Sequence, residues 1–498
     1  MGWQMKPIVA LIAFVLIGGC TFSQVPTPTA SPGPDTWHVG RWFTNSSGQV
    51  VLFHGVNMVD KQAPYYPAAE GFGPSDISLI QSMGLNLVRL GVIFAGVMPS
   101  PGQVNTNYID QLVSQVNQLS KAGIYVILDF HQDEYSSSII SSADGFPAWA
   151  TMTNGMPNHD YGFPANYLFN AAVNAAFDNF WNNTTVPGGP GTPWGDGLQN
   201  YYQQGLAAVA SAFASNTDVL GYEIMNEPWP GSVYPSCLNP STGCPGFDNG
   251  PYLNFIHRSI TAIRSVDPDH LIFYEPTSLF NVGIPTNLGY VGDYGTGFAF
   301  HVYPICSQDN GGITNGQVNS SCGPQEETVF ANALAQQARS GSALILTEWG
   351  NSLSDAFNNQ EALEADNAMV SWAYWSFDGT VVPNIANAPT SGNVNQNVVD
   401  DLARPYPMTT DGTPIEWNFS PNDKIFTLEY STSCASGCAN FETGQYTQIS
   451  LPKLIYPTGY SVALSGATIV SNANAPVLQL KNNPGATRVS VEISQSNP

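Results

Sequence analysis

One segment of the chain reads Ala343-Leu344-Ile345-Leu346-Thr347-Glu348-Trp349-Gly350, a short apolar run that ends in a carboxylate and an aromatic residue. A second segment, Gly221-Tyr222-Glu223-Ile224-Met225-Asn226-Glu227-Pro228, also ends in a glutamate. The apolar residues lack the alternation of a half-exposed strand, which is typical of parallel strands covered on both faces. We therefore expect two buried strands with polar groups at their carboxyl ends.

Six further runs of this kind are separated by stretches with helical patterns. The eight runs are residues 50–57, 85–92, 124–131, 218–226, 270–275, 297–303, 343–348 and 370–377. In one intervening stretch Ile109, Leu112, Val116 and Leu119 recur at helical spacing, and the pattern stops at Gly123. Eight strands alternating with helices predict the α/β class and a closed (β/α)8 TIM barrel.

The last part of the chain has a different pattern of short, alternating strands. We expect the barrel over residues 37–405 and a smaller C-terminal β-sandwich over residues 406–498. A sandwich could bind carbohydrate or could pack on the barrel and stabilise it. Two insertions, residues 132–200 and 228–250, follow the ends of barrel strands, so we expect them to shape the substrate pocket.

The N-terminus has the features of a secretion signal over residues 1–19, with a lysine at position 6 and an apolar run from 7 to 17. Leu16-Ile17-Gly18-Gly19-Cys20 resembles a bacterial lipobox, and a Pro/Thr-rich spacer follows over residues 20–36. Ordinary cleavage before Trp37 is the alternative to acylation of Cys20. We expect a protein that is secreted or lipid-anchored at the bacterial cell surface.

The composition excludes some partners. With 13 basic and 37 acidic residues, the formal net charge is -24, which argues against nucleic acid and against electrostatic docking on anionic membranes. Apart from Cys20 there are six cysteines in three local pairs, and the simplest disulfide pattern joins 237 with 244, 306 with 322 and 434 with 438. Their spacing does not favour a metal site. We also expect no cofactor, and a monomer.

The two strand-end glutamates suggest the chemistry. Hydrolysis of a glycoside with retention needs one carboxylate to attack the anomeric carbon and one carboxylic acid to protonate the leaving oxygen, about 5 to 5.5 Å apart. Glu227 and Glu348 end the fourth and seventh runs, and strand ends at a barrel mouth can provide this separation. A lone strand-end glutamate is more often a surface or capping residue, but two in such contexts favour catalysis.

Several motifs together resemble the cellulase-like glycoside hydrolase family five. They are Asn226-Glu227-Pro228, Glu348-Trp349-Gly350, Arg89, His131, His301-Val302-Tyr303 and Trp375. The resemblance implies that Glu227 is the general acid/base and Glu348 the nucleophile.

The remaining motif residues receive supporting roles. Asn226 can hydrogen-bond the sugar 2-hydroxyl, and Trp375 fits as the floor on which the sugar stacks. His131 and His301 fit as polar pocket walls. Arg89 and Tyr303 would orient Glu348 and keep it ionised by lowering its pKa. Structural roles are the alternative: an ion pair for Arg89 and a core position for His131.

Other segments are similar to those of the endoglycoceramidases, which cut the β-glucosidic bond between an intact glycan and ceramide. The similar segments are residues 54–61, 129–133, 145–150 and 404–407. This resemblance implies that Lys61 and Asp133 bind sugars, although Lys61 could be a solvated surface residue. The substrate would be a glycosphingolipid at a membrane or micelle surface, with its ceramide on an apolar lip. Candidates for the lip are Trp149, Phe180, Trp181 and Trp194, although buried packing is the commoner fate of any single aromatic residue.

Alternatives to this function remain. A β-glucanase or cellulase would need an open cleft for a polymer, and a glucosylceramidase would remove a single glucose. A non-catalytic carbohydrate-binding protein would not need both glutamates. Glu223 and Glu275 are nearby carboxylates that could line the site or orient another polar residue, and we rank them below Glu227 and Glu348.

Overall fold

The structure is a computed structural model that describes residues 36–308, 313–314, 317–437 and 445–496. The expected signal segment 1–19, and the expected spacer up to residue 35, lie outside the described residues. Among the helices that are described, none combines the length and apolarity needed to cross a membrane.

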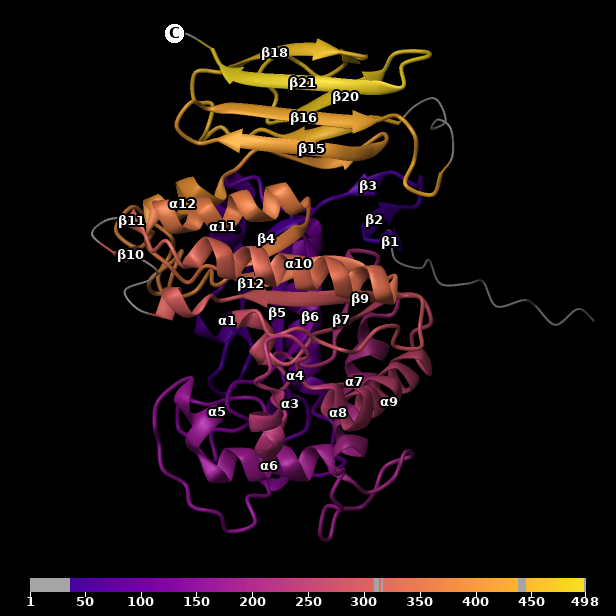
Figure 1. Ribbon diagram of the computed structural model, residues 1–498, viewed down its shortest axis with the longest axis vertical. Helices are drawn as coiled ribbons and strands as arrows, with labels where there is room; N and C mark the ends of the chain where they lie inside the picture. The colour runs from indigo at the N-terminus through magenta and orange to yellow at the C-terminus, as the bar shows by residue number, and fades with distance from the viewer. Residues whose placement is uncertain (1–35, 309–312, 315–316, 438–444, 497–498) are drawn as a thin grey trace, which may run out of the picture. The chain divides into compact units, whose positions relative to one another are not determined.

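Eight parallel strands close into a barrel (Figure 1). In chain order they are β4 (His54–Met58), β5 (Leu87–Ile93), β6 (Tyr125–His131), β7 (Val219–Glu223), β8 (Leu271–Tyr274), β9 (Thr296–Val302), β12 (Ala343–Trp349) and β13 (Ser371–Tyr374). Every residue of β5 and β12 is buried, because side chains fill the barrel and helices cover it. The predicted α/β barrel is confirmed.

Helices follow the barrel strands and occupy the insertions. They are α1 (Pro67–Glu70), α2 (Pro74–Ser82), α3 (Phe94–Val97), α4 (Thr106–Lys121), α5 (Ala165–Phe169), α6 (Ala171–Trp181), α7 (Leu198–Phe213), α8 (Pro245–Phe247), α9 (Leu253–Arg264), α10 (Cys322–Ser340), α11 (Asp355–Ala368) and α12 (Gln396–Leu402). Helix α4 begins where the Asn105 side chain accepts the Tyr108 N–H, which caps the helix. It buries Ile109, Leu112, Val116 and Leu119, as the helical spacing predicts.

The chain enters the fold through three short strands, β1 (Thr36–Val39), β2 (Trp42–Asn45) and β3 (Val50–Val51). The prediction of one barrel strand over residues 50–57 is therefore wrong in its first part. β3 pairs with β14 (Tyr406–Thr410) of the C-terminal domain, and only β4 enters the barrel. Local apolarity cannot show this break, because both halves of the run are buried. Phe43 and Phe53 pack together, 5.3 Å between ring centroids, with the buried side chains at the amino ends of the barrel strands.

The C-terminal part is built of antiparallel strands. They are β14, β15 (Thr413–Ser420), β16 (Ile425–Ser431), β17 (Thr447–Ser450), β18 (Tyr460–Ser465), β19 (Ala467–Ile469), β20 (Val477–Asn482) and β21 (Arg488–Gln495). One sheet has the order β1-β2-β3-β14-β17-β20-β19 and the other β15-β16-β21-β18. Their buried side chains, including Phe426, Val491, Leu478 and Leu480, belong to one core, as expected for a sandwich. A further short hairpin, β10 (Ile313–Thr314) with β11 (Gln317–Val318), precedes α10.

The sandwich packs on the barrel through α11 and β15 (Figure 1). Trp417 on β15 is buried, and its Nε1–H donates to Asp366 Oδ1 on α11 over 3.0 Å. The buried Arg404 donates to the other oxygen of Asp366 over 2.7 Å. Of the two roles considered for this domain, packing on the barrel is therefore observed, and carbohydrate binding stays untested.

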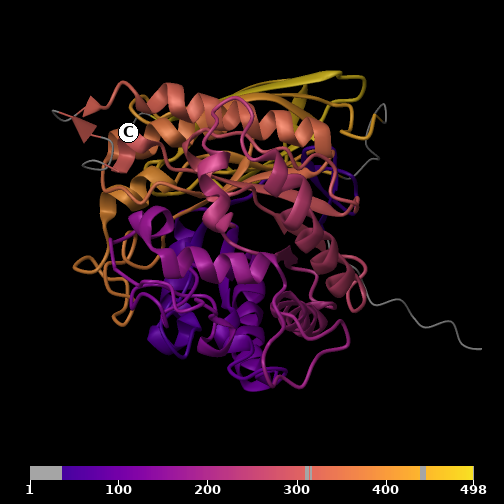
Figure 2. The ribbon, with the colours of Figure 1, turned by 60° about the horizontal axis from the view of Figure 1, so that its bottom comes forward.

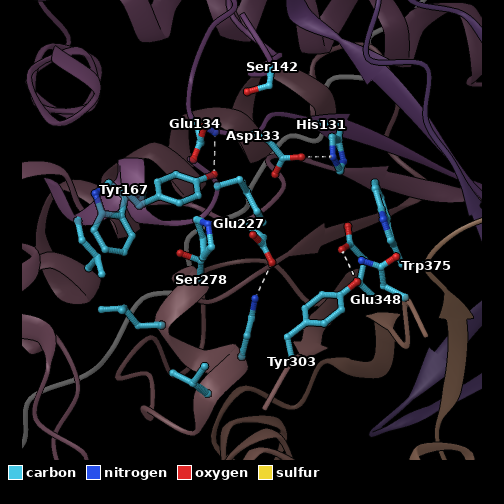
Figure 3. Close-up of a pocket in the computed structure, with 18 of the residues that line it drawn as sticks. His131, Asp133, Glu134, Ser142, Tyr167, Glu227, Ser278, Tyr303, Glu348 and Trp375 are labelled. Carbon is cyan, nitrogen blue, oxygen red and sulfur yellow. Dashed lines mark hydrogen bonds and ion pairs between the residues drawn. The ribbon is translucent and has the colours of Figure 1, made fainter. Parts of the chain in front are cut away.

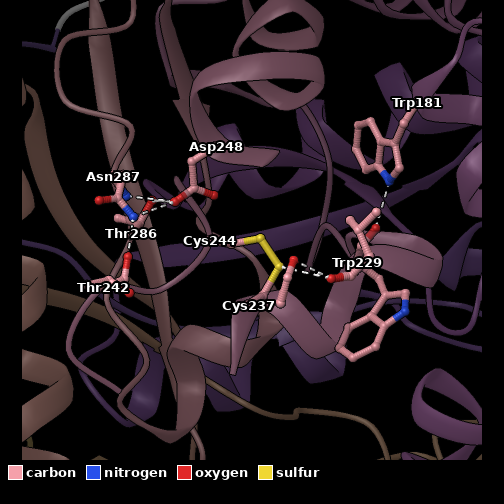
Figure 4. The surroundings of a disulfide bond; sticks show 10 residues. Trp181, Trp229, Cys237, Thr242, Cys244, Asp248, Thr286 and Asn287 are labelled. Atoms are coloured by element: carbon pink, nitrogen blue, oxygen red, sulfur yellow. Dashed lines mark hydrogen bonds between the residues drawn. A yellow bond between two sulfur atoms is a disulfide. The ribbon is translucent and has the colours of Figure 1, made fainter. Parts of the chain in front are cut away.

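Two of the three predicted disulfides are present, Cys237–Cys244 and Cys306–Cys322. The third predicted pair includes Cys438, which lies outside the described residues. Figure 4 shows the first disulfide near Trp229, between the 3₁₀ segment Gly231–Cys237 and α8. Trp181 Nε1–H donates to the Trp229 carbonyl over 2.7 Å, so this insertion is tied to the preceding one. The helices α5, α6 and α8 of these insertions lie in the lower part of Figure 1, which comes forward in Figure 2.

Candidate active site

The two predicted catalytic glutamates meet at the carboxyl ends of the strands. Glu227 follows β7, and Glu348 is the second-last residue of β12. A break in the pairing of β12 with β9, between Leu346 and Glu348, places Glu348 opposite His301. One oxygen of each glutamate and a nitrogen of His301 all lie within 4.8 Å of one another. This separation suits double displacement with retention.

Glu227 is held in an uncommon backbone conformation, with φ of 43°. Its N–H donates to Glu275 Oε2 over 3.0 Å, and its carbonyl accepts the Gln132 amide over 3.0 Å. Its side chain accepts a hydrogen bond from Asn281, and His301 Nδ1 lies 2.9 Å from the same oxygen. Backbone and carboxylate are thus both fixed, as a group that must deliver a proton to one oxygen requires.

Glu348 contacts both partners that the sequence predicts for it. Arg89 donates to Glu348 Oε1 over 2.6 Å, and the Tyr303 hydroxyl donates to Oε2 over 3.1 Å. Burial nevertheless raises the pKa of Glu348. Arg89 lowers this pKa, as expected, and so does His301, but together they offset only part of the rise, so the expectation of a net lowering is wrong. The two partners orient the carboxylate and counter the effect of its burial.

Arg89 lies at the centre of a buried network and does not line the pocket. It donates to both oxygens of Glu223, over 3.1 and 2.6 Å, and to Asn226 Oδ1 over 2.8 Å. It also lies within 3.2 Å of Glu275 and 3.1 Å of Asp129. A single guanidinium thus balances several carboxylates and connects them to Glu348.

The pKa values of Glu223 and Glu275 are shifted in opposite directions in this network. Burial opposes ionisation of Glu223, but the two-pronged contact with Arg89 lowers its pKa. Burial raises the pKa of Glu275 well above its usual range, with His301 opposing the rise and Glu223 adding to it. Both carboxyl groups therefore support the site from within the barrel, which agrees with their lower rank as catalytic candidates.

Four of the six predicted substrate-binding residues form one cluster. Lys61 makes an ion pair with Asp133, and its ammonium lies 4.5 Å from the centre of the Trp375 ring. The His131 ring stacks near Trp375, with 5.3 Å between centroids. Burial opposes protonation of His131, but Asp129, 2.7 Å away, raises its pKa to about 10. The cluster therefore offers charged donors and acceptors beside an aromatic face, as sugar hydroxyls and ring carbons require.

Asn226 and His301 are buried beside the pocket and do not line it. The Asn226 oxygen accepts from Arg89, and its amide donates to the Gln132 carbonyl over 3.1 Å. The expected hydrogen bond from Asn226 to the sugar 2-hydroxyl therefore stays a prediction. The expectation that His301 forms a pocket wall is wrong, because this side chain is fully buried and contacts Glu227, Glu275 and Glu348. It is a positioning residue between the two glutamates.

The glutamates open into a pocket of about 580 Å³. Its polar lining includes Lys61, His131, Asp133, Glu227, Tyr303, Glu348, Asn351 and Trp375. Its apolar lining includes Phe163, Tyr167, Leu168, Leu279, Val282 and Ile305. Figure 3 shows Tyr167 on one side of Glu227 and Trp375, beside Glu348, on the other. Glu134 and Ser278 also line the pocket near Tyr167, so that side of the pocket is only partly apolar.

None of the four aromatic residues considered for the apolar lip lines this pocket, and buried packing, the alternative for each of them, is observed for Phe180 and Trp181. The other two are Trp149 and Trp194. Alternating patterns do not distinguish aromatic side chains that pack inside an insertion from those that face a cavity. The apolar wall comes instead from α5 and its neighbours and from loops after β8 and β9.

Three groups of side chains have a spacing that could hold a metal ion. They are His131 with Asp133 and Asp144, Glu223 with Glu275 and His301, and Glu227 with His301 and Glu348. Each group already contacts a cationic side chain, Lys61 in the first and Arg89 in the other two. The protein thus offsets these negative charges with its own cations, and a reaction without metal stays a prediction.

Sequence reasoning missed three residues of the site. Asn281, in the 3₁₀ segment Ser278–Val282, contacts Glu227; Gln132 holds the carbonyls after β7; and Asp144 lies 4.0 Å from the Lys61 ammonium. Gln132 belongs to a quoted motif but received no role. No pattern could have identified Asn281, since it lies in a loop and acts through a residue 54 positions earlier.

Two family models match the chain. The model described as Cellulase (glycosyl hydrolase family 5) matches residues 44–380, and the glycoside hydrolase family 5 C-terminal domain matches residues 404–493. Endoglycoceramidase I of Rhodococcus hoagii (strain 103S) is 32% identical over 473 residues, covering 91% of this chain and 89% of that protein. Endoglycoceramidase of Hydra vulgaris is 28% identical over 452 residues, covering 83% and 80%.

Solved structures of endoglycoceramidases also match this chain over most of its length. Endo-glycoceramidase II from Rhodococcus sp., in a complex with ganglioside GM3, matches with a TM-score of 0.74 and 25% identity, covering 92% of this chain and 99% of that one. A lactosyl-enzyme intermediate of the same protein matches with a TM-score of 0.71 and 26% identity, covering 91% and 99%.

Proposed function

The chain belongs to glycosyl hydrolase family 5, and we propose that it is an endoglycoceramidase, which hydrolyses the β-glucosidic bond between the oligosaccharide and the ceramide of a glycosphingolipid. One observation carries the proposal: the glutamate pair opens into a single pocket that is lined both by the charged residues Lys61 and Asp133 and by large apolar side chains such as Phe163 and Leu168. A substrate that combines a glycan with hydrocarbon chains matches this mixed lining. The extended similarity to endoglycoceramidases supports it.

The reaction follows from the geometry. Glu348 attacks the anomeric carbon of the glucose, and the bond from this carbon to the ceramide oxygen breaks as Glu227 delivers its proton to that oxygen. Glu227 then takes a proton from water, whose oxygen attacks the same carbon and releases Glu348. Arg89 and Tyr303 keep the two oxygens of Glu348 oriented during both steps. Two inversions leave the product in the β configuration.

Lys61, Asp133, His131 and Trp375 would hold the sugars. The Lys61 ammonium retains donors beyond its bond to Asp133, and the Asp133 carboxylate retains lone pairs for hydroxyl groups. The apolar residues that line the pocket would contact the first part of the ceramide. In this proposal the reaction uses neither a metal ion nor an organic cofactor.

A comparison of substrates tests the proposal. Lactosylceramide and a ganglioside, dispersed in neutral detergent, are incubated beside cellulose, laminarin and glucosylceramide. We expect release of ceramide from the two oligosaccharide lipids. Activity on the polymers alone would support a β-glucanase instead, and release from glucosylceramide without lactosylceramide would support a glucosylceramidase.

We also propose that the chain is exported and either secreted or acylated at Cys20. The support is the N-terminal pattern of an apolar run followed by Leu16-Ile17-Gly18-Gly19-Cys20. Mass spectrometry of the mature N-terminus tests this. A diacylglyceryl cysteine at position 20 would support the anchored form, a start near Trp37 the secreted form, and retention of residues 1–19 would contradict both.

A further inference from the structure

A second pocket, of about 350 Å³, lies beside α7 and α9, outside the strands of the barrel. These two helices pack against each other (Figure 1). The lining comes from both helices and from the loop before α7, and it includes Asn183, Trp194, Asn200, Gln203, His257 and Arg258. None of these residues lines the pocket of Glu227 and Glu348. The proposed reaction therefore does not use the second pocket.

The loop before α7 holds Trp194 at the second pocket. Thr192 and Gly195 exchange two backbone hydrogen bonds, over 2.7 and 3.1 Å, and the Trp194 N–H donates to the Thr192 hydroxyl over 3.1 Å. Gly195 has a φ of 130°, and a Cβ at this position would lie 2.8 Å from Asn200 Oδ1 on α7. Glycine thus allows the turn to approach the helix this closely. The indole ring is partly exposed and belongs to no hydrophobic cluster of the described residues, so it is accessible to a ligand.

Gln203 brings a buried hydrogen-bond donor to the second pocket. Its side chain is 1% exposed, and its Nε2 has no hydrogen-bond partner among the described residues. Its Oε1 lies 3.5 Å from Asn200 Nδ2, so the N–H groups of the amide are the part left unpaired. A buried donor without an acceptor is unfavourable, and folded proteins rarely contain one. An acceptor atom of a ligand in the pocket would satisfy it.

Arg258 gives the second pocket a positive charge. Its Nη1 donates to Gln199 Oε1 over 3.0 Å, which holds the guanidinium against α7. Arg258 is not among the described arginines that form ion pairs. No aspartate or glutamate of the described residues lines this pocket, although the chain has 37 acidic and 13 basic residues. The local charge therefore favours an anionic group.

The other polar side chains of the second pocket are already bonded to protein atoms. Asn183 Nδ2 donates to Asn200 Oδ1 over 3.0 Å, and Asn183 Oδ1 accepts the Gln199 N–H over 2.8 Å. The groups left for a ligand are then the donors of Gln203 and Arg258. A ligand must supply acceptor oxygens, one of them charged, together with an apolar face for the indole ring.

We propose that the second pocket binds an acidic sugar unit of a glycan, such as a uronic or sialic acid residue. The carboxylate pairs with the Arg258 guanidinium, an oxygen of the sugar accepts from the Gln203 amide, and the C–H face of the ring lies on Trp194. The volume is at the lower end of the range of ligand pockets, roughly 300 to 1,000 Å³, which suits a single sugar unit. This binding goes beyond the proposed hydrolysis and does not depend on it.

The test measures binding by saturation-transfer NMR on the whole protein. The probes are the methyl glycosides of glucuronic acid and of sialic acid, with methyl glucoside as the neutral sugar and acetate as the free carboxylate. The variants are Arg258→Gln and Gln203→Leu. The matched control is Arg339→Gln, because Arg339 is also exposed and donates to a glutamine, over 2.8 Å, but lines neither pocket.

We expect at least one acidic glycoside to bind about tenfold or more tightly than methyl glucoside and acetate, and Arg258→Gln to remove this preference. Gln203→Leu should weaken binding by about threefold or more without lowering the melting temperature, since leucine replaces an unpaired donor. The control variant should bind within about twofold of the unmodified chain. In all variants, hydrolysis of a soluble aryl β-lactoside should be unchanged, and saturating acidic glycoside should not inhibit it.

Four results would overturn the proposal: no binding of either acidic glycoside, equal binding of the neutral sugar or of acetate, full binding by Arg258→Gln, or competitive inhibition of lactoside hydrolysis. The last result would place the acidic sugar in the catalytic pocket. A lower melting temperature of Gln203→Leu with unchanged binding would likewise contradict it, because Gln203 would then stabilise the fold and not the ligand. If the unmodified chain hydrolyses no lactoside, the proposed function fails, while the binding measurements still decide on the second pocket.

Discussion

Glu348 is the nucleophile of the proposed reaction, because the covalent bond to the sugar forms on its carboxylate. Glu348→Gln removes the nucleophile but keeps the size of the side chain and one oxygen that accepts from Arg89, while the amide NH2 faces the Tyr303 hydroxyl, which can accept in turn. We expect turnover to fall by a factor of roughly 10⁴ or more, while glycolipid binding persists. Rates on lactosylceramide and calorimetric titration with the oligosaccharide measure the two properties.

An activated 2-deoxy-2-fluoro lactoside gives an independent check of this role. Such a substrate forms the covalent intermediate but releases it slowly, so the labelled peptide identifies the nucleophile. Label on Glu348 supports the assignment. Label on Glu223 or Glu275 would contradict it and would require another account of the buried network around Arg89.

Glu227 has a different role and calls for a different experiment. Glu227→Ala removes the proton donor, so we expect turnover of ceramide substrates to fall by roughly 10² to 10⁴. Aryl lactosides with good leaving groups need no proton and stay active in the first step. Azide then replaces water at the intermediate, and NMR of the product should show a β-lactosyl azide. An α-azide would instead identify Glu227 as the nucleophile.

These roles could be expected from the sequence because Glu227 and Glu348 stand in short motifs at strand ends. Residues that act through them were harder to find. Asn281 and Asp144 have no motif, and their partners Glu227 and Lys61 are 54 and 83 positions away in the chain. The direction of the Glu348 pKa was also beyond sequence reasoning, because it depends on how far burial outweighs the contacts with Arg89 and His301.

Among the elements, the contact between α11 and β15 joins barrel and sandwich. Trp417→Phe deletes the donor to the buried Asp366, and we expect a loss of about 1 to 3 kcal/mol in the free energy of unfolding. Activity on a soluble lactoside should be unchanged. Urea unfolding followed by circular dichroism measures the loss, and Trp37→Phe, at a position that is 42% exposed, is the control. Equal stability of the two variants would mean that this contact does not stabilise the fold.

The barrel strands were predictable because each is a local apolar run, and the helix over residues 106–121 because its spacing is local as well. The path by which the chain enters the fold could not be predicted from the sequence. Whether Val50 belongs to the barrel or to the sheet is decided by its pairing with Thr410, 360 positions later, and both environments are buried. The same holds for Trp181, whose burial depends on the fold of a whole insertion.

The acidity of the whole chain suggests how its stability depends on pH. Glu326 is fully buried, and burial raises its pKa to about 7. Burial also raises the pKa of Asp144 to about 7. Between about pH 4, where such groups ionise in the unfolded chain, and pH 7, the folded state binds more protons. Stability therefore falls as pH rises through this window, and the net charge of -24 adds repulsion.

We expect a higher melting temperature at pH 5 than at pH 8. In Glu326→Gln the decrease in the free energy of unfolding from pH 5 to pH 8 should be smaller by on the order of 2 kcal/mol, since the neutral amide has no charge to bury. Calorimetry at both pH values measures this, with the exposed Glu416→Gln as the control. If Glu326→Gln loses as much stability between pH 5 and pH 8 as the unmodified chain does, Glu326 does not contribute to the pH dependence of stability.

The identity of the broken bond decides the proposed function, and one measurement reports it. Lactosylceramide is hydrolysed in water enriched in oxygen-18, and both products are analysed by mass spectrometry, with Glu348→Gln as the inactive control. Attack at the glucose anomeric carbon should give intact lactose that carries the heavy oxygen and ceramide that carries none. Heavy oxygen in the ceramide, or galactose with glucosylceramide in place of lactose, would contradict it.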